Sequence, residues 1–96
     1  MPYIRTTVSK SINPGQRDIL KSKLGNAIAL IPGKSEAWLM LAFEDNMSMY
    51  FKGDNSADYA YVEVSLFGGA SDAAYDRLTA AISEIISETL GIDSSN

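Results

Sequence analysis

The feature that most constrains the fold of this chain is an internal repeat. Residues 3–33 align with residues 61–91 at a constant offset of 58 positions and without a gap. The matched pairs combine three identities with apolar-for-apolar replacements: Tyr3 with Tyr61, Ile4 with Val62, Val8 with Leu66, Asp18 with Asp76, Leu20 with Leu78, Leu24 with Ile82, Ile28 with Ile86 and Gly33 with Gly91. A repeat of this length predicts two copies of one supersecondary unit.

Each copy has the pattern of a strand followed by a helix. Residues 3–8 (YIRTTV) are typical of a short strand. From residue 14 to residue 31 the apolar residues recur at helical spacing. Asn13 is a suitable N-cap for this helix, Pro14 suits its first position, and the pair Pro32-Gly33 predicts its end.

The remaining segments complete the pattern. Residues 37–43 (AWLMLAF) form a nearly continuous apolar run, which predicts a strand buried on both faces of a parallel sheet. A short strand is expected over residues 47–52, followed by a turn, and another strand over residues 61–67 (YVEVSLF). The second helix is expected from Ser71 or Asp72 to about Leu90.

The expected fold class is therefore α/β, with two pseudo-symmetric βαβ units whose sheet packs on two helices. Residues 1–96 form a single domain in this interpretation, with unit one at 2–45, a connection at 46–58 and unit two at 59–96. At the offset of 58, the counterparts of the strand at 37–43 would be residues 95–101, although the sequence stops at 96. We therefore expect the final strand to be missing from this chain, which would then be incomplete at its C-terminus.

The composition excludes several kinds of chemistry. The chain contains no cysteine and no histidine, so disulfides, thiolate nucleophiles and histidine bases or metal ligands are excluded. The net charge of −4 disfavours binding to nucleic acid. No apolar run approaches the roughly 20 residues that span a membrane. We expect a cytoplasmic protein, with secretion without a signal peptide as the alternative, that uses no metal or cofactor and binds neither nucleic acid nor membrane.

Acid–base chemistry near neutral pH must then use a carboxylate, a lysine or the chain terminus, and the sequence offers a candidate terminus. Removal of Met1 would leave Pro2 with a free secondary amine at the start of the first strand. Burial lowers the pKa of such an amine from its usual value of about 7.7–8.0, so that it can act as a general base.

Two further positions are expected to lie near Pro2. Lys34 precedes the second strand, and the starts of two parallel strands lie at the same end of a sheet. Phe67 and Gly68 end the third main strand, at 61–67, which returns to that end of the sheet if it runs antiparallel to the first. The ammonium group of Lys34 could hold a carboxylate or stabilise an enolate oxygen.

Six segments distributed over the chain carry a family resemblance: MPYI, IPGKSEAW, LAFEDN, YFKGDN, VEVSLFGGAS and ETLGI. With them the sequence resembles the macrophage migration inhibitory factor branch of the tautomerase superfamily. The resemblance implies a homotrimer with active sites between subunits, and keto–enol tautomerisation of phenylpyruvate-like α-keto acids without a cofactor.

The resemblance also implies roles for four residues. Pro2 would be the general base, and Lys34 would bind the carboxylate or carbonyl of the substrate. Phe67 takes the place of an aliphatic residue whose backbone N–H contacts substrate, and Trp38 falls near an aromatic residue that lines the pocket from a neighbouring subunit.

The sequence departs from the family pattern in two respects. The tyrosine and asparagine that family members carry in a final strand and tail are not seen, and the Cys-x-x-Cys motif of the animal members is absent. Two alternatives stay open: a non-catalytic signalling or protein-interaction module on the same fold, and a ferredoxin-like regulatory domain that binds a small ligand, because βαββαβ patterns look alike in sequence.

Overall fold

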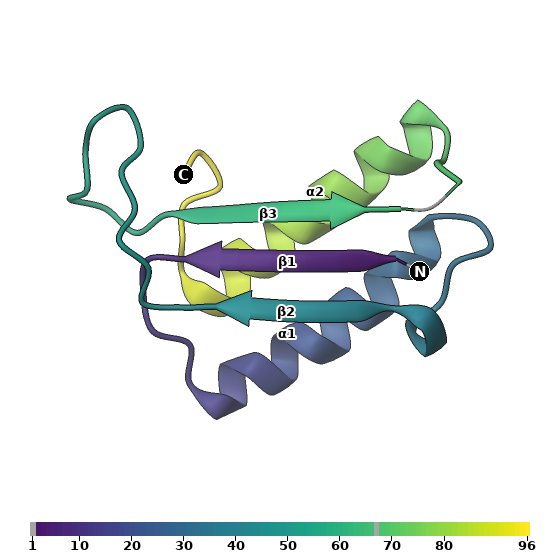
Figure 1. The fold of residues 1–96 in the computed structure, drawn as a ribbon, viewed down its shortest axis with the longest axis horizontal. Helices are drawn as coiled ribbons and strands as arrows, with labels where there is room; N and C mark the ends of the chain where they lie inside the picture. The colour runs from purple at the N-terminus through teal and green to yellow at the C-terminus, as the bar shows by residue number, and fades with distance from the viewer. Residues whose placement is uncertain (1, 67) are drawn as a thin grey trace.

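The computed structural model describes residues 2–66 and 68–96 and shows one mixed sheet with two helices on one of its faces (Figure 1). The strands are ordered β2-β1-β3. In chain order the elements are β1 (Tyr3–Val8), α1 (Pro14–Ala27), the 3-10 turns η1 (Ile28–Leu30) and η2 (Glu36–Trp38), β2 (Met40–Glu44), β3 (Ala60–Ser65) and α2 (Asp72–Leu90).

Strand pairing confirms the expected topology. β1 pairs in parallel with β2, with Tyr3 opposite Met40, and antiparallel with β3, with Tyr3 opposite Ser65. The strands before and after α1 are therefore immediate neighbours. In the ferredoxin-like split βαβ arrangement another strand separates these two strands. The pairing thus argues against the ferredoxin-like alternative.

Both helices begin at residues that the sequence marks for this position, and α2 also ends as predicted, whereas the helix expected to reach residue 31 ends at Ala27 and continues as the 3-10 turn η1. The side chain of Asn13 accepts a hydrogen bond from the backbone N–H of Gln16, whose own side chain accepts from the N–H of Asn13. Ser71 caps α2 in the same way, by accepting from the N–H of Ala74. Gly91 ends α2 with a φ of 69°, a left-handed conformation that favours glycine.

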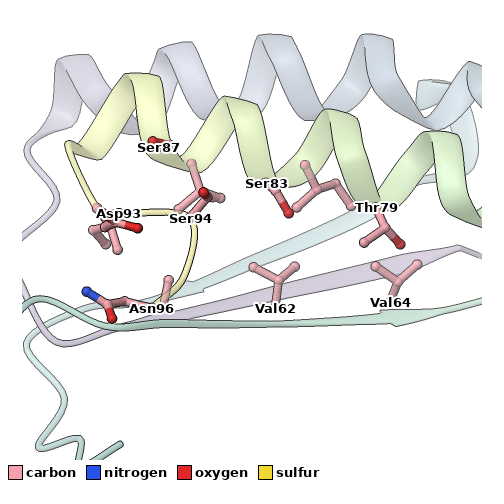
Figure 2. A pocket seen from close by; sticks show the side chains of 12 residues that line it. Val62, Val64, Thr79, Ser83, Ser87, Asp93, Ser94 and Asn96 are labelled. Atoms are coloured by element: carbon pink, nitrogen blue, oxygen red, sulfur yellow. The ribbon is translucent and has the colours of Figure 1, made fainter.

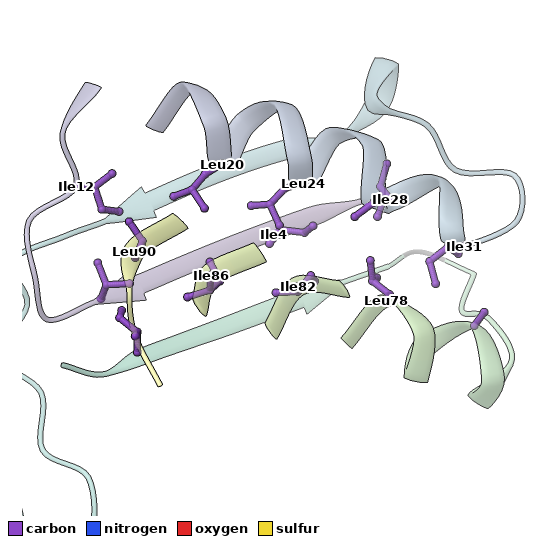
Figure 3. Packing of buried hydrophobic residues seen from close by; sticks show 14 residues of the cluster. Ile4, Ile12, Leu20, Leu24, Ile28, Ile31, Leu78, Ile82, Ile86 and Leu90 are labelled. Atoms are coloured by element: carbon purple, nitrogen blue, oxygen red, sulfur yellow. The ribbon is translucent and has the colours of Figure 1, made fainter. Parts of the chain in front are cut away.

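The core lies between the sheet and the two helices (Figure 3). Along β1 the buried residues alternate with half-buried ones, so Ile4, Thr6 and Val8 face the helices. Both helices contribute the apolar positions that match in the repeat: Leu20, Leu24 and Ile28 from the first unit, and Leu78, Ile82 and Ile86 from the second. Repetition of one strand–helix pattern thus builds one shared core.

The strand expected over residues 37–43 differs from the prediction in two ways. It begins only at Met40, because Glu36–Trp38 forms the turn η2. It is also not buried on both faces, since Met40 is 50% exposed and the remaining residues of β2 are half-buried. The physical reason is that β2 is an edge strand and the helices cover only one face of the sheet.

Two other predicted strands need correction. Residues 47–52 form no strand; an isolated bridge between Phe51 and Asp54 closes a tight turn in which Lys52 and Gly53 have φ values of 54° and 77°. The strand predicted over residues 61–67 is observed at Ala60–Ser65.

The outer edge of β3 carries no further strand within the described residues. At this edge the N–H of Ala60 donates a hydrogen bond to the backbone O of Asn96 at 3.4 Å. The absence of a strand here is consistent with the expected missing final strand. No helix in the described part of the chain is long and apolar enough to cross a membrane.

Candidate functional site

Pro2 is buried at the beginning of β1, and its backbone ties the two parallel strands together. The carbonyl oxygen of Pro2 accepts a hydrogen bond of 2.9 Å from the backbone N–H of Met40, the first residue of β2. This contact uses the carbonyl of Pro2 and leaves its nitrogen outside the ladder, as a residue without a backbone N–H requires. The chain start is thus held against the start of β2.

Lys34 lies in the loop that leads from η1 to η2. A turn shapes this loop: Gly33 has a φ of 81°, and the N–H of Lys34 donates to the carbonyl of Ile31 at 3.1 Å. Lys34 is half-buried, whereas the side chain of Trp38, at the end of η2, is 74% exposed. An exposed tryptophan in one chain is available to contact a second molecule.

The end of β3 returns to the same end of the sheet. Ser65 lies opposite Tyr3, so β3 ends where β1 begins. Phe67 lies outside the described residues, and its neighbour Gly68 adopts a φ of 88°. Figure 1 shows the N-terminus, the loop before β2 and the end of β3 at one end of the molecule. The topology therefore brings the three predicted segments together, as the strand directions had indicated.

The uncovered face of the sheet carries a row of charged groups. The guanidinium of Arg5 donates a hydrogen bond to the carboxylate of Glu44 on β2 and lies 3.9 Å from a carboxylate oxygen of Glu63 on β3. The hydrogen bond with Glu44 is the main cause that raises the pKa of Arg5. Arg5 thus links all three strands on the face opposite the helices.

A groove between β3 and α2 contains, among the described residues that line it, none of the site residues predicted from the sequence (Figure 2). Its volume is about 230 Å³. Val62 and Val64 project into it from β3, Thr79 and Ser83 border it on α2, and Asn96 lies at its tail end. The groove borders the free edge of β3, where the repeat places the counterpart of β2.

A second cavity of about 300 Å³ is lined by Thr7, near the end of β1, and by Ala60, at the beginning of β3, so it lies at the opposite end of the sheet from Pro2. Aromatic side chains, among them Tyr50, Phe51 and Tyr61, contribute to its lining. Neither of these two cavities is lined by Pro2, Lys34 or Trp38. Among the described residues, no group of three or more acidic side chains is placed to hold a metal ion.

Comparison with known proteins identifies the family. No family model and no curated protein sequence matches the chain. Among solved structures, MIF2 of Leishmania major is 30% identical, with a TM-score of 0.89, over 99% of this chain and 81% of that protein.

Two further structures share the fold at lower identity. A macrophage migration inhibitory factor homologue from Prochlorococcus marinus is 22% identical, with a TM-score of 0.85, over 97% of this chain and 80% of that protein. A fused wild-type 4-OT, described as a symmetric trimer, is 20% identical, with a TM-score of 0.84, over 97% and 77%. The identity and coverage of the Leishmania protein, together with the shared fold, show that this chain belongs to the macrophage migration inhibitory factor-like branch of the tautomerase superfamily.

Proposed function

We propose that this protein is a cofactor-independent keto–enol tautomerase of phenylpyruvate-like α-keto acids, with the nitrogen of Pro2 as the general base after removal of Met1. One observation carries the proposal: the buried Pro2, the loop with Lys34 and the end of β3 occupy one end of the sheet (Figure 1). Membership of the tautomerase superfamily supports it.

The proposed reaction moves one proton within the substrate. The neutral secondary amine of Pro2 takes a proton from the enol hydroxyl and returns a proton to the adjacent carbon, which gives the keto acid and regenerates the amine. The ammonium of Lys34 holds the carboxylate and stabilises the negative charge that develops on the oxygen. The backbone N–H of Phe67 is assigned a further contact with substrate.

We also propose that the protein acts as a homotrimer. The helices leave one face of the sheet uncovered, and Tyr61 on that face is 61% exposed. Trp38 is exposed near the proposed site and would line the pocket of a neighbouring subunit. The similar 4-OT structure is described as a trimer. A pocket completed between copies is consistent with the two described cavities of the single chain, neither of which includes Pro2.

The same observation about the cavities favours one competing function, a protein-interaction module without catalysis. This alternative needs no pocket at Pro2 and no removal of Met1. Measurement of catalysis therefore distinguishes the two functions.

The decisive experiment measures the conversion of enol to keto phenylpyruvate by protein whose mass shows that Met1 is absent. Matched samples carry Pro2→Phe, which retains Met1 because a bulky residue follows it, Lys34→Ala, and the control Lys52→Ala in the distant turn. We expect the Pro2 variant to lose about 10²–10⁴-fold in rate and the Lys34 variant to lose about 100-fold in kcat/KM, with the control unchanged. Equal, negligible rates in all samples would refute the proposed function for this class of substrate.

A further inference from the structure

The side chain of Glu36 attaches the loop that carries Lys34 and Trp38 to helix α1. A carboxylate oxygen of Glu36 lies 3.2 Å from the ammonium nitrogen of Lys21. The same carboxylate lies directly over Gly25: a Cβ atom at position 25 would be 2.2 Å from Oε2 of Glu36 and 2.5 Å from its Cδ. Only glycine leaves room for the carboxylate where it now lies.

The glycine is not required by the conformation of the helix. Gly25 lies within α1, where glycine costs about 1 kcal/mol relative to alanine, and it is not among the residues with positive φ. It is buried although it has no side chain. Lys21 and Gly25 are four positions apart and therefore share one face of the helix. Lys21 and Gly25 together accommodate the side chain of Glu36: Lys21 supplies a cation for the carboxylate, and Gly25 leaves the space that the carboxylate occupies.

Glu36 is linked through the backbone to both parts of the proposed site. Its carbonyl accepts from the N–H of Leu39 at 3.1 Å, which closes the turn η2 around Trp38. Lys34 lies two residues before Glu36. Met40, which follows Leu39, donates to the carbonyl of Pro2 at 2.9 Å. Glu36 thus lies inside the short segment between Lys34 and β2, the strand beside Pro2.

We propose that Lys21, Gly25 and Glu36 form a clamp that positions the substrate-binding segment 34–38. This inference rests on the proposed function, because it assigns the three residues to the same site. They do not touch substrate; they limit the positions that the segment adopts before substrate arrives. Ordering the segment in advance lowers the entropic cost of binding.

The test uses Gly25→Ala and Lys21→Met, with Lys23→Met as the matched control. Lys23 lies on the same helix and pairs with Glu88 of α2 at 3.8 Å, away from the segment. Alanine at position 25 displaces only the end of the flexible Glu36 side chain and improves helix propensity. We therefore expect Gly25→Ala to retain the Tm of the parent protein while it releases the loop.

In kinetics with phenylpyruvate, we expect both clamp variants to raise KM about two- to fivefold with kcat within twofold of the parent. This range corresponds to an exposed ion pair, and a change confined to KM indicates loss of uniform binding. The double variant should raise KM no more than the larger single effect, because both substitutions release the same carboxylate. An unchanged KM in Gly25→Ala would overturn the positioning role.

A second readout does not depend on catalysis. Trp38 is the only tryptophan of the chain and lies two residues beyond Glu36. We expect its fluorescence anisotropy to fall and its quenching by acrylamide to rise in both clamp variants and not in Lys23→Met. Unchanged fluorescence in Gly25→Ala and Lys21→Met would refute the clamp. Changed fluorescence in a protein without tautomerase activity would retain the clamp and refute the proposed function instead.

Discussion

Tyr59 and Asp54 lie in the connection between β2 and β3 and are hydrogen-bonded to each other. The hydroxyl of Tyr59 donates to Asp54 Oδ2 at 2.7 Å, and the hydroxyl of Ser56 donates to the same oxygen at 2.8 Å. The ring of Tyr59 meets Phe51 edge-on, with centroids 5.9 Å apart. This hydrogen bond between Tyr59 and Asp54 is the main cause of two shifts: it lowers the pKa of Asp54 and raises the pKa of Tyr59.

These shifts predict a pH window for the stability of the connection. Because the pKa of Asp54 is lowered from 3.8, its contribution is present above that value and is lost as the pH falls through the folded pKa. Because the pKa of Tyr59 is raised from 10.0, its contribution is present below that value and is lost as the pH rises through the folded pKa. Tyr59→Phe keeps the ring and should reduce both losses.

The measurement is Tm as a function of pH, from about 2 to 11, for the parent protein and Tyr59→Phe. We expect the difference in Tm to be largest between the two limits and to shrink toward each of them. If the difference in Tm between the parent protein and Tyr59→Phe were constant with pH, the hydroxyl of Tyr59 would contribute to stability through packing and not through its hydrogen bond with Asp54.

At the level of elements, the C-terminus of α2 depends on the left-handed conformation of Gly91. A Cβ atom at this position would meet no atom within 4 Å, so the cost of Gly91→Ala comes from the backbone alone. We expect a loss of about 1–2 kcal/mol in the free energy of unfolding, measured by urea denaturation. Gly15→Ala, in the first turn of α1, is the control and should cost less, because Gly15 has no positive φ. Equal losses would contradict this account.

The groove between β3 and α2 gives a second prediction for an element. In unit one the equivalent space beside β1 is filled by β2, whose Leu41 and Phe43 pair with the helix-facing positions of β1. We expect the sequence LMLAFE, copied from residues 39–44 and attached after Asn96, to pair in parallel with β3 and slow amide exchange along its free edge.

The control for this extension carries serine in place of the copied Leu41 and Phe43. Burial of two large apolar side chains is worth up to about 1.5–3 kcal/mol each, and 1 kcal/mol shifts the Tm of a domain of this size by roughly 4–8 °C. The apolar extension should therefore unfold several degrees above its serine counterpart. Equal Tm values would mean that the groove does not accept a strand.

At the level of the whole molecule, a charge introduced on the uncovered sheet face is expected to prevent trimer assembly, whereas a charge introduced on the helical face is expected to leave the trimer intact. Tyr61 projects from the uncovered face and is 61% exposed, while Ile19 is 47% exposed on α1. If copies associate through the sheet, Tyr61→Arg places a charge in the interface, whereas Ile19→Arg leaves it in water. We expect light scattering to show trimers for the parent and Ile19→Arg, and monomers for Tyr61→Arg. A monomeric parent protein would contradict the proposed trimer.

Local patterns were sufficient to predict much of the fold. The first strand, the starts of both helices and the end of α2 were identified from alternation, capping residues and Gly91, because these signals act within a few residues. The repeat predicted the pseudo-symmetric arrangement, and the pairing of β1 with β2 and β3 agrees with it. For the site, the sequence indicated Pro2, Lys34, Trp38 and Phe67, whose roles stay predictions.

Other features depended on contacts between distant parts of the chain. The sequence by itself determined the first strand, the two helices and the apolar helix positions that form the core, because each is marked by a local pattern of residues. Only the tertiary structure decided that β2 starts at Met40, that one sheet face stays uncovered, and that Glu36 lies between Lys21 and Gly25. Packing between distant segments sets the register of one strand against another and the position of a loop on a helix. No local pattern of residues encodes such packing.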